Sequence, residues 1–187
     1  MKKLFISLTI IGFSFAGNAQ IMSFSENAQI AFRKSPEFNE ASIEGSKYFD
    51  DSFSFAKVNK GTEDFQIRYN ALTDLFEYKN NKEVFELIKE QNLHFLFSDG
   101  KVYELFNYSL SNKDVSRYHQ VLTNNNNTKV SKFKSIKLVP AKAAANSYEQ
   151  ATAAHYKQNK DAYFVTYNNQ TIEFNGKAKD LEKLIPG

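Results

Sequence analysis

The 187-residue chain carries 24 Lys and Arg residues against 21 Asp and Glu residues, with 18 Phe, 10 Tyr, no Trp and no Cys. The lack of cysteine excludes disulfides, a cysteine nucleophile and a lipid anchor on cysteine. A charge balance this close to neutral provides no long-range field to gather nucleic acid, so we expect no nucleic-acid partner.

The N-terminus has the organisation of a cleaved signal peptide. Lys2 and Lys3 precede an apolar run at 4–15, and small residues at 16–19 suit a signal peptidase, so we expect cleavage after Ala19. The run has about a dozen residues, whereas a membrane-spanning helix needs roughly 20, which disfavours a retained transmembrane anchor. Loss of both lysines leaves 22 basic against 21 acidic residues. We therefore expect a periplasmic or extracellular protein, with outer-membrane association as a further option.

The stretch 65–87 gives the clearest structural signal. Apolar and polar residues alternate over 65–70, and the same period of two returns at 75–79 and 83–87. This period is typical of strands with one buried face. The breaks between the runs contain Thr, Asp and Asn, which tolerate left-handed backbone. The pattern predicts three antiparallel strands of a meander.

Other strands follow from the same criteria. The strands and hairpins predicted in this way lie at 48–58, 93–108, 115–122 and 162–174. Within 93–108, Asp99 and Gly100 join two aromatic-rich runs, which is a strong signal for a tight hairpin turn.

Less regular segments flank these strands. Residues 20–45 are polar with unevenly spaced apolar residues and Pro36, and we interpret them as an irregular arm with one or two helical turns. Residues 129–139 change face part-way, which a β-bulge would explain. The composition of 141–154 favours either a solvated linker or a short helix. The Asn-rich tract 124–127 is expected to be an exposed loop.

The C-terminal segment 177–185 has helical spacing. Leu181, Leu184 and Ile185 share one stripe between charged residues, which predicts a short amphipathic helix lying on a sheet. The predicted fold class is mainly β: an antiparallel meander of roughly eight to ten strands, curled or split into two layers, with this helix at its end. After the signal peptide and the arm, residues 46–187 are expected to form a single β-rich domain.

Several short motifs follow one another along the chain. They are Tyr48-Phe49, Arg68-Tyr69-Asn70 with Glu77, Tyr118-His119-Gln120-Val121-Leu122, Asp161-Ala162-Tyr163-Phe164-Val165 and Lys179-Asp180-Leu181. In this order they resemble a family of uncharacterised secreted β-rich proteins of Gram-negative bacteria. The resemblance covers most of the chain after the signal peptide and implies no activity, cofactor or catalytic residue.

The chemistry-bearing residues show no catalytic pattern. His94, His119 and His155 lie on separate predicted elements without the ligand spacing of a zinc site, so we expect surface or half-buried histidines and no metal. The sequence contains no Gly-x-Ser-x-Gly elbow and no Gly-rich phosphate loop. We expect no catalytic residue and no cofactor.

Arg68 and Glu77 face each other across the first predicted turn of the meander. A cross-strand ion pair there would contribute about 0.2 to 1 kcal/mol. The alternative is that Arg68 grips a carboxylate or phosphate of a ligand, a geometry for which Arg is suited.

Aromatic side chains occupy both faces of several predicted strands. Two packed layers or a strongly bent sheet would bury both faces, whereas an exposed aromatic row would form a partner surface. The candidate interaction residues are Arg68, Glu77, Tyr103, Tyr108, Tyr118, Tyr163 and Tyr167.

These features favour a non-enzymatic secreted binding or structural protein. We expect an accessory component that docks onto an outer-membrane or secreted partner protein, for example in a secretion or surface-assembly machine. One alternative is a carrier that holds a small apolar ligand between β layers. A hydrolase with a site assembled from scattered acids and histidines is the least favoured reading.

The Gly100 turn yields a first prediction. Gly100→Val places a β-branched residue where the tight turn needs positive φ, so it should destabilise the fold by about 1 kcal/mol or more. Chemical denaturation of the variant measures the effect. An unchanged unfolding midpoint would show that the turn does not require positive φ.

Overall fold

The structure, a computed structural model, describes residues 20–25, 28–36, 42–59, 61–90, 93–125, 127–144, 146, 148 and 150–185. The predicted signal peptide, residues 1–19, lies outside the described residues.

The described residues form fourteen strands and one helix, more strands than the sequence predicted. In chain order these are β1 (Gln20–Ser25), β2 (Ala28–Lys34), β3 (Ser54–Val58), β4 (Asp64–Asn70), β5 (Leu75–Asn80), β6 (Glu83–Leu87), β7 (His94–Phe97), β8 (Val102–Leu110), β9 (Lys113–Asn125), β10 (Thr128–Phe133), β11 (Ile136–Val139), β12 (His155–Gln158), β13 (Ala162–Tyr167), β14 (Gln170–Phe174) and α1 (Ala178–Leu184).

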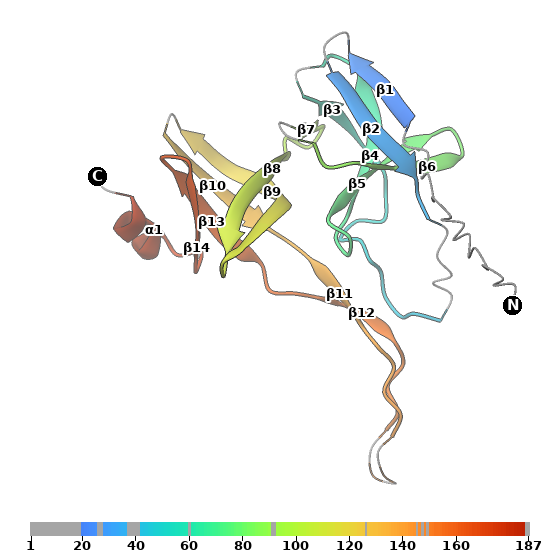
Figure 1. The fold of residues 1–187 in the computed structure, drawn as a ribbon. Helices are drawn as coiled ribbons and strands as arrows, with labels where there is room; N and C mark the ends of the chain where they lie inside the picture. The colour runs from blue at the N-terminus through green and yellow to red at the C-terminus, as the bar shows by residue number, and fades with distance from the viewer. Residues whose placement is uncertain are drawn as a thin grey trace, which may run out of the picture.

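Twelve strands form one antiparallel sheet, and β11 and β12 pair separately. The large sheet has the order β1-β2-β6-β5-β4-β3-β7-β8-β9-β10-β13-β14. Its strands gather into two groups, β1 to β7 in one and β8 to β10 with β13 and β14 in the other, while the β11–β12 ribbon projects away from both (Figure 1). The mainly β, antiparallel fold predicted from the sequence is therefore confirmed.

The predicted meander is β4, β5 and β6. Arg68 pairs with Glu77 across β4 and β5, and Glu77 pairs with Glu86 across β5 and β6. The turns that join these strands place Asp74 at φ 54° and Asn81 at φ 55°, the left-handed conformation expected of these residue types. Gly100 likewise has φ 83°, as its predicted hairpin turn requires.

Two sequence interpretations were wrong. The segment 20–45 contains the hairpin β1–β2, and β2 extends the sheet by pairing Phe32 with Leu87 and Arg33 with Glu86. The change of face within 129–139 arises because the chain leaves the large sheet after Phe133 and enters the separate ribbon at Ile136.

Two further segments differ in detail from expectation. A register shift does occur within β10, between Val130 and Ser131 opposite β9, but it does not cause the change of face. The described residues of 141–154 are not helical, and a bridge between Lys142 and Thr152 continues the ribbon.

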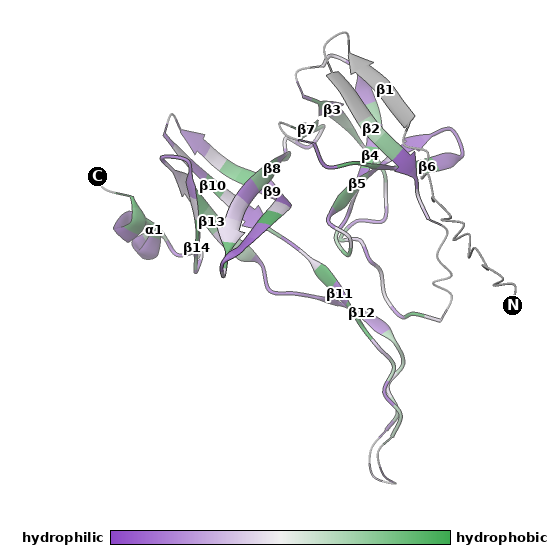
Figure 2. Ribbon diagram, viewed as in Figure 1, coloured by the Kyte–Doolittle hydropathy of each residue, from purple (hydrophilic) through white to green (hydrophobic). Residues whose placement is uncertain are grey.

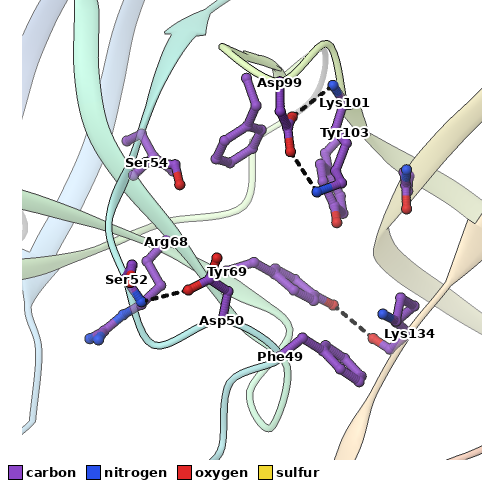
Figure 3. Close-up of a pocket in the computed structure, with 13 residues that line it drawn as sticks. Phe49, Asp50, Ser52, Ser54, Arg68, Tyr69, Asp99, Lys101, Tyr103 and Lys134 are labelled. Atoms are coloured by element: carbon purple, nitrogen blue, oxygen red, sulfur yellow. Dashed lines mark hydrogen bonds and ion pairs between the residues drawn. The ribbon is translucent and has the colours of Figure 1, made fainter.

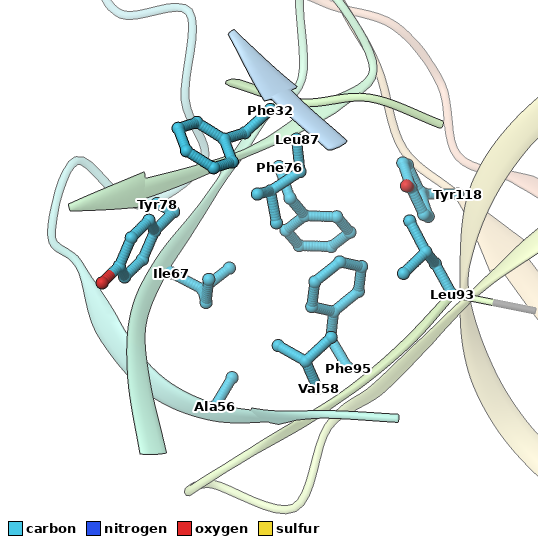
Figure 4. Packing of buried hydrophobic residues seen from close by; sticks show 10 residues of the cluster. All are labelled: Phe32, Ala56, Val58, Ile67, Phe76, Tyr78, Leu87, Leu93, Phe95 and Tyr118. Carbon is cyan, nitrogen blue, oxygen red and sulfur yellow. The ribbon is translucent and has the colours of Figure 1, made fainter. Parts of the chain in front are cut away.

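The first core fills the curl of the N-terminal strands (Figure 4). Its buried members are Phe32, Ala56, Val58, Ile67, Phe76, Tyr78, Leu87, Leu93, Phe95 and Tyr118. The Phe76 and Phe95 rings lie with their centroids 4.0 Å apart, and Tyr118 packs edge-on to Phe76 at 4.8 Å. Tyr118 reaches this core from β9, so the core is completed by a strand of the second group.

The next residue of β9, His119, is buried in a second core on the opposite face of the strand. Its ring stacks on Phe106 at 4.8 Å and contacts Phe164 at 4.6 Å. His119 Nδ1 lies 3.0 Å from Ser131 Oγ, and Nε2 lies 3.1 Å from the Tyr108 hydroxyl. Since successive side chains of a strand point to opposite faces, the β8–β9 hairpin supplies both cores.

The helix α1 follows β14 at the end of the chain and is mostly hydrophilic (Figure 2). None of its residues is buried, and Leu181, Leu184 and Ile185 are half-buried. The amphipathic helix was predicted correctly, but its stripe does not form part of either core. Within the described ranges, no helix has the length and apolarity to cross a membrane.

Burial of His119 gives the fold a predictable response to acid. Burial lowers the pKa of His119 to about 3, and the positive charge of Arg117 adds to the lowering. Between an ordinary His pKa of about 6.5 and that value, the unfolded chain binds a proton that the folded chain does not. The free energy of unfolding should therefore decrease as the pH is lowered through this window, by about 2 kcal/mol from pH 7.5 to pH 5.

The matched variant is His119→Gln, which retains polar groups but does not titrate. Urea unfolding at the two pH values measures the loss in each protein. The variant should lose about 2 kcal/mol less than the native chain between pH 7.5 and pH 5. Equal acid sensitivity in both proteins would show that other groups govern the response.

Candidate functional site

A pocket lies where the first core meets the β8–β9 hairpin and the base of the ribbon (Figure 3). Its volume is about 320 Å³. Its lining residues include Phe49, Asp50, Tyr69, Phe97, Asp99, Lys101, Tyr103 and Lys134. The pocket thus draws on several segments that are distant in sequence.

One wall of the pocket is aromatic. The ring centroid of Tyr103 lies 5.7 Å from that of Tyr69 and 5.7 Å from that of Phe97. All three side chains pack against the fully buried Phe76, which fixes their positions. Burial raises the pKa of Tyr103 to about 12, so its hydroxyl stays protonated at neutral pH. This wall is preformed and mostly apolar.

Asp74 connects the pocket to β9. Its Oδ1 lies 2.8 Å from the Tyr69 hydroxyl and accepts a hydrogen bond from the Tyr118 amide at 3.2 Å. Its Oδ2 pairs with Lys89 Nζ at 2.5 Å, and the same ammonium donates to the Ser116 carbonyl at 2.8 Å. Burial raises the pKa of Asp74, and the hydrogen bond and charge of Lys89 oppose the rise. The β4–β5 turn is thereby tied to β9.

Lys134 lies at the opposite side of the pocket, between β10 and β11. Its Nζ sits 3.9 Å from the Phe49 ring centroid, and its carbonyl oxygen lies 3.2 Å from the Tyr69 hydroxyl. Among the described residues, no carboxylate lies within 4 Å of this ammonium. Partial burial lowers the pKa of Lys134; Asp161 opposes the lowering, and Lys132 and Lys101 add to it.

The other charged residues of the pocket already have partners. Lys101 Nζ pairs with Asp99 Oδ2 at 2.5 Å, and Asp99 Oδ1 accepts a hydrogen bond from the Lys101 amide. Asp50 is exposed, and its Oδ1 accepts a hydrogen bond from the Ser52 amide at 2.9 Å. Arg68, the other half-buried cation of the pocket, pairs with Glu77, so among the described lining residues Lys134 is the half-buried cation without a carboxylate partner.

In the wall of the pocket, Arg68 forms the predicted cross-strand ion pair with Glu77. Arg68 Nη2 and Nε lie 2.6 and 3.2 Å from Glu77 Oε2, and the two side chains are 16% and 3% exposed. The Tyr48 hydroxyl and Asn70 Nδ2 donate to the same carboxylate. Glu77 is buried and Arg68 is half-buried, and the pair has further hydrogen bonds, so its surroundings differ from those of an exposed surface ion pair.

Arg68 also holds the loop that carries Phe49 and Asp50. Its guanidinium lies 3.7 Å from the Tyr48 ring centroid and 4.3 Å from that of Phe53, and Nη1 donates to the Asp51 carbonyl at 2.8 Å. Because its donors are engaged in this way, Arg68 is a positioning residue for the loop rather than the ligand-gripping arginine considered as an alternative.

The remaining candidate interaction residues do not form one exposed row. Tyr103 lines the pocket, whereas Tyr118 is 1% exposed, so proposing Tyr118 as an interaction residue was wrong. Its strand is covered on both faces, which the sequence pattern did not disclose. Tyr108 packs against His119 and Phe164, and Tyr163 and Tyr167 are half-buried on β13.

Sequence reasoning missed Lys134 and Phe49 as pocket residues. Lys134 follows directly after β10, where the alternation of apolar and polar residues is interrupted. This interruption did not indicate which residues Lys134 would contact. Phe49 was assigned to a predicted strand, but it lies in the loop before β3. Both positions depend on contacts between distant segments.

The histidines are separate from one another, as expected, but the expectation of surface or half-buried histidines was wrong for His119, which is fully buried. His94 lies on β7, His119 on β9 and His155 on β12. Ser131 and His119 are within hydrogen-bonding distance, but both are 0% exposed, so a substrate has no access to them. No group of three or more His, Cys, Asp or Glu residues in the described part of the chain could hold a metal ion.

The β11–β12 ribbon is anchored at its base. The Ile136 amide donates to the Ala71 carbonyl and the Asn159 amide to the Ser135 carbonyl, at 2.9 and 3.0 Å. On the β12 side, Glu44 exchanges backbone hydrogen bonds of 2.9 Å with Ala154 and Tyr156. Beyond this base lies Tyr148, whose side chain is 98% exposed.

No family model, curated protein or solved structure matches the chain.

The Arg68–Glu77 pair yields a stability prediction. Arg68→Ala leaves the Glu77 carboxylate buried without its cation, so it should destabilise the protein by about 3 kcal/mol. The matched control is Lys34→Ala, because Lys34 and Glu83 form an ion pair in which both side chains are at least 60% exposed. That change should cost less than about 1 kcal/mol. Urea unfolding measures both, and similar costs would contradict the assignment of Arg68 as a buried anchor.

Proposed function

We propose that this protein is a non-enzymatic binding protein that docks onto a partner protein through the projecting ribbon at 136–160. The observation that carries the proposal is the exposure of this ribbon. It leaves both cores (Figure 1), and Tyr148 near its tip is 98% exposed. An extended hairpin with an exposed aromatic residue contributes little to either core, whereas Tyr is well suited to protein interfaces.

The charge of the ribbon indicates the kind of partner surface. The segment 136–160 contains four lysines, Lys137, Lys142, Lys157 and Lys160, and one acid, Glu149. It therefore carries a formal charge of +3 in a chain whose exported form is almost neutral. Electrostatic complementarity favours an acidic surface on the partner.

The anchored base supports a docking role because it limits the freedom of the ribbon. Hydrogen bonds fix β11 to Ala71 and β12 to Glu44. A preorganised element loses less conformational freedom on binding than a loose loop does. Taken with the predicted export, this supports a partner in the outer membrane or among secreted proteins, for example in a secretion or surface-assembly machine.

Site-specific photocrosslinking tests this proposal, since the chain has no cysteine of its own. Tyr148→Cys, labelled with a benzophenone maleimide and irradiated with envelope extract of the source bacterium, should give one discrete adduct. Ile172→Cys, at an exposed position on β14, is the control and should not give this adduct. The adduct protein is then purified and its binding to the native chain is measured.

Reversing the charge of the ribbon tests whether the partner surface is acidic. Combined Lys137→Glu and Lys157→Glu changes should weaken binding to the purified partner by at least about tenfold, and the weakening should depend on salt. Equal adducts from both cysteine positions, or binding unaffected by the charge reversal, would overturn the proposal.

A further inference from the structure

We propose that the pocket at the base of the ribbon binds a small planar carboxylate, with its apolar body against Tyr69, Phe97 and Tyr103 and its carboxylate at Lys134. This site goes beyond the proposed docking function and does not depend on it. It also differs from a carrier of an apolar ligand between β layers, because it lies at the junction of the sheet with the ribbon.

The volume limits the ligand to a small molecule. About 320 Å³ is at the lower end of the range for small-molecule sites. An aromatic ring with a short acidic side chain is of this size.

The aromatic wall determines the body of the ligand. Tyr69, Phe97 and Tyr103 are held in place by their contacts with Phe76, so their surfaces need no rearrangement before binding. Offset or edge-on contacts between aromatic rings contribute beyond the burial of apolar area. A planar body therefore gains more from this wall than a flexible chain of the same size.

Lys134 determines the charge of the ligand. It rests on the Phe49 ring, and no carboxylate of the described residues pairs with it. By contrast, Lys101 is neutralised by Asp99, and Arg68 by Glu77. The Asp50 carboxylate caps its own turn and is exposed, so solvent screens its charge more than that of the half-buried lysine.

The Lys134 backbone is positioned for this role. Its carbonyl accepts from Tyr69, a member of the aromatic wall, at 3.2 Å, and the ribbon base begins two residues later. The cation and the wall are thus fixed relative to each other. Such preorganisation reduces the entropic cost of binding a ligand that contacts both.

Titration of the exported chain with trans-cinnamate, followed by calorimetry and by NMR, tests the proposal. Cinnamate should bind saturably, with shifts confined to the pocket residues. Cinnamamide, which has the same body without the charge, should bind at least about tenfold more weakly, as expected for loss of a charge-assisted hydrogen bond. Decanoate tests the planar body and should also bind more weakly than cinnamate.

The matched variants are Lys134→Met and Lys132→Met. Lys132 is close in sequence but pairs with Asp161 at 3.6 Å and does not line the pocket. Lys134→Met should weaken cinnamate binding about tenfold and leave cinnamamide binding unchanged, whereas Lys132→Met should change neither by more than about twofold. Thermal unfolding of each variant verifies that it is folded.

Three outcomes would overturn the proposal of this binding site. These are the absence of saturable cinnamate binding, an equal loss in the two lysine variants, and tighter binding of decanoate than of cinnamate. Each is independent of the crosslinking result, because no partner protein enters the titration.

Discussion

The structure depends on one alternation within β9. Tyr118 and His119 are neighbours in sequence, both are at most 1% exposed, and they enter different cores. Tyr118 completes an aromatic cluster with Phe76 and Phe95, and His119 is stacked between Phe106 and Phe164. A strand with two buried faces cannot shift register by one residue without exchanging these side chains between the cores. The hairpin β8–β9 therefore sets how the two groups of strands are placed.

The pocket and the ribbon follow from this placement. Tyr103, on the face of β8 toward the first core, meets Tyr69 and Phe97 of the N-terminal strands. Asp74 ties the same region to β9 by accepting from the Tyr118 amide, and Lys89 compensates its buried charge. The chain that leaves β10 passes this junction at Lys134 and continues into the ribbon. A binding function at this position would thus rest on a scaffold held by both cores, which is how precise sites are commonly supported.

Local patterns predicted much of the fold, and non-local contacts determined what they missed. The period of two located the strands of the meander, and the preference of Asp, Asn and Gly for positive φ located the turns at Asp74, Asn81 and Gly100. The alternation of side chains in the two strands joined by the first turn also placed Arg68 opposite Glu77. The alternation of side chains did not reveal the loop contacts around this pair, or that both faces of β9 are covered. Lys134 has no local signature at all, since its role depends on Phe49 and Tyr69, which are remote in sequence.

The two cores should unfold together, because one hairpin belongs to both. The chain has no Trp, so Phe85→Trp on β6 and Phe133→Trp on β10 each introduce a single fluorescent reporter, one for each core. The decisive measurement is urea unfolding of both reporters with and without Tyr118→Ala. If one hairpin couples the two cores, their transitions should coincide and loss of the Tyr118 ring should lower both midpoints equally. A lower midpoint at the Phe85→Trp reporter with an unchanged midpoint at the Phe133→Trp reporter would contradict this coupling.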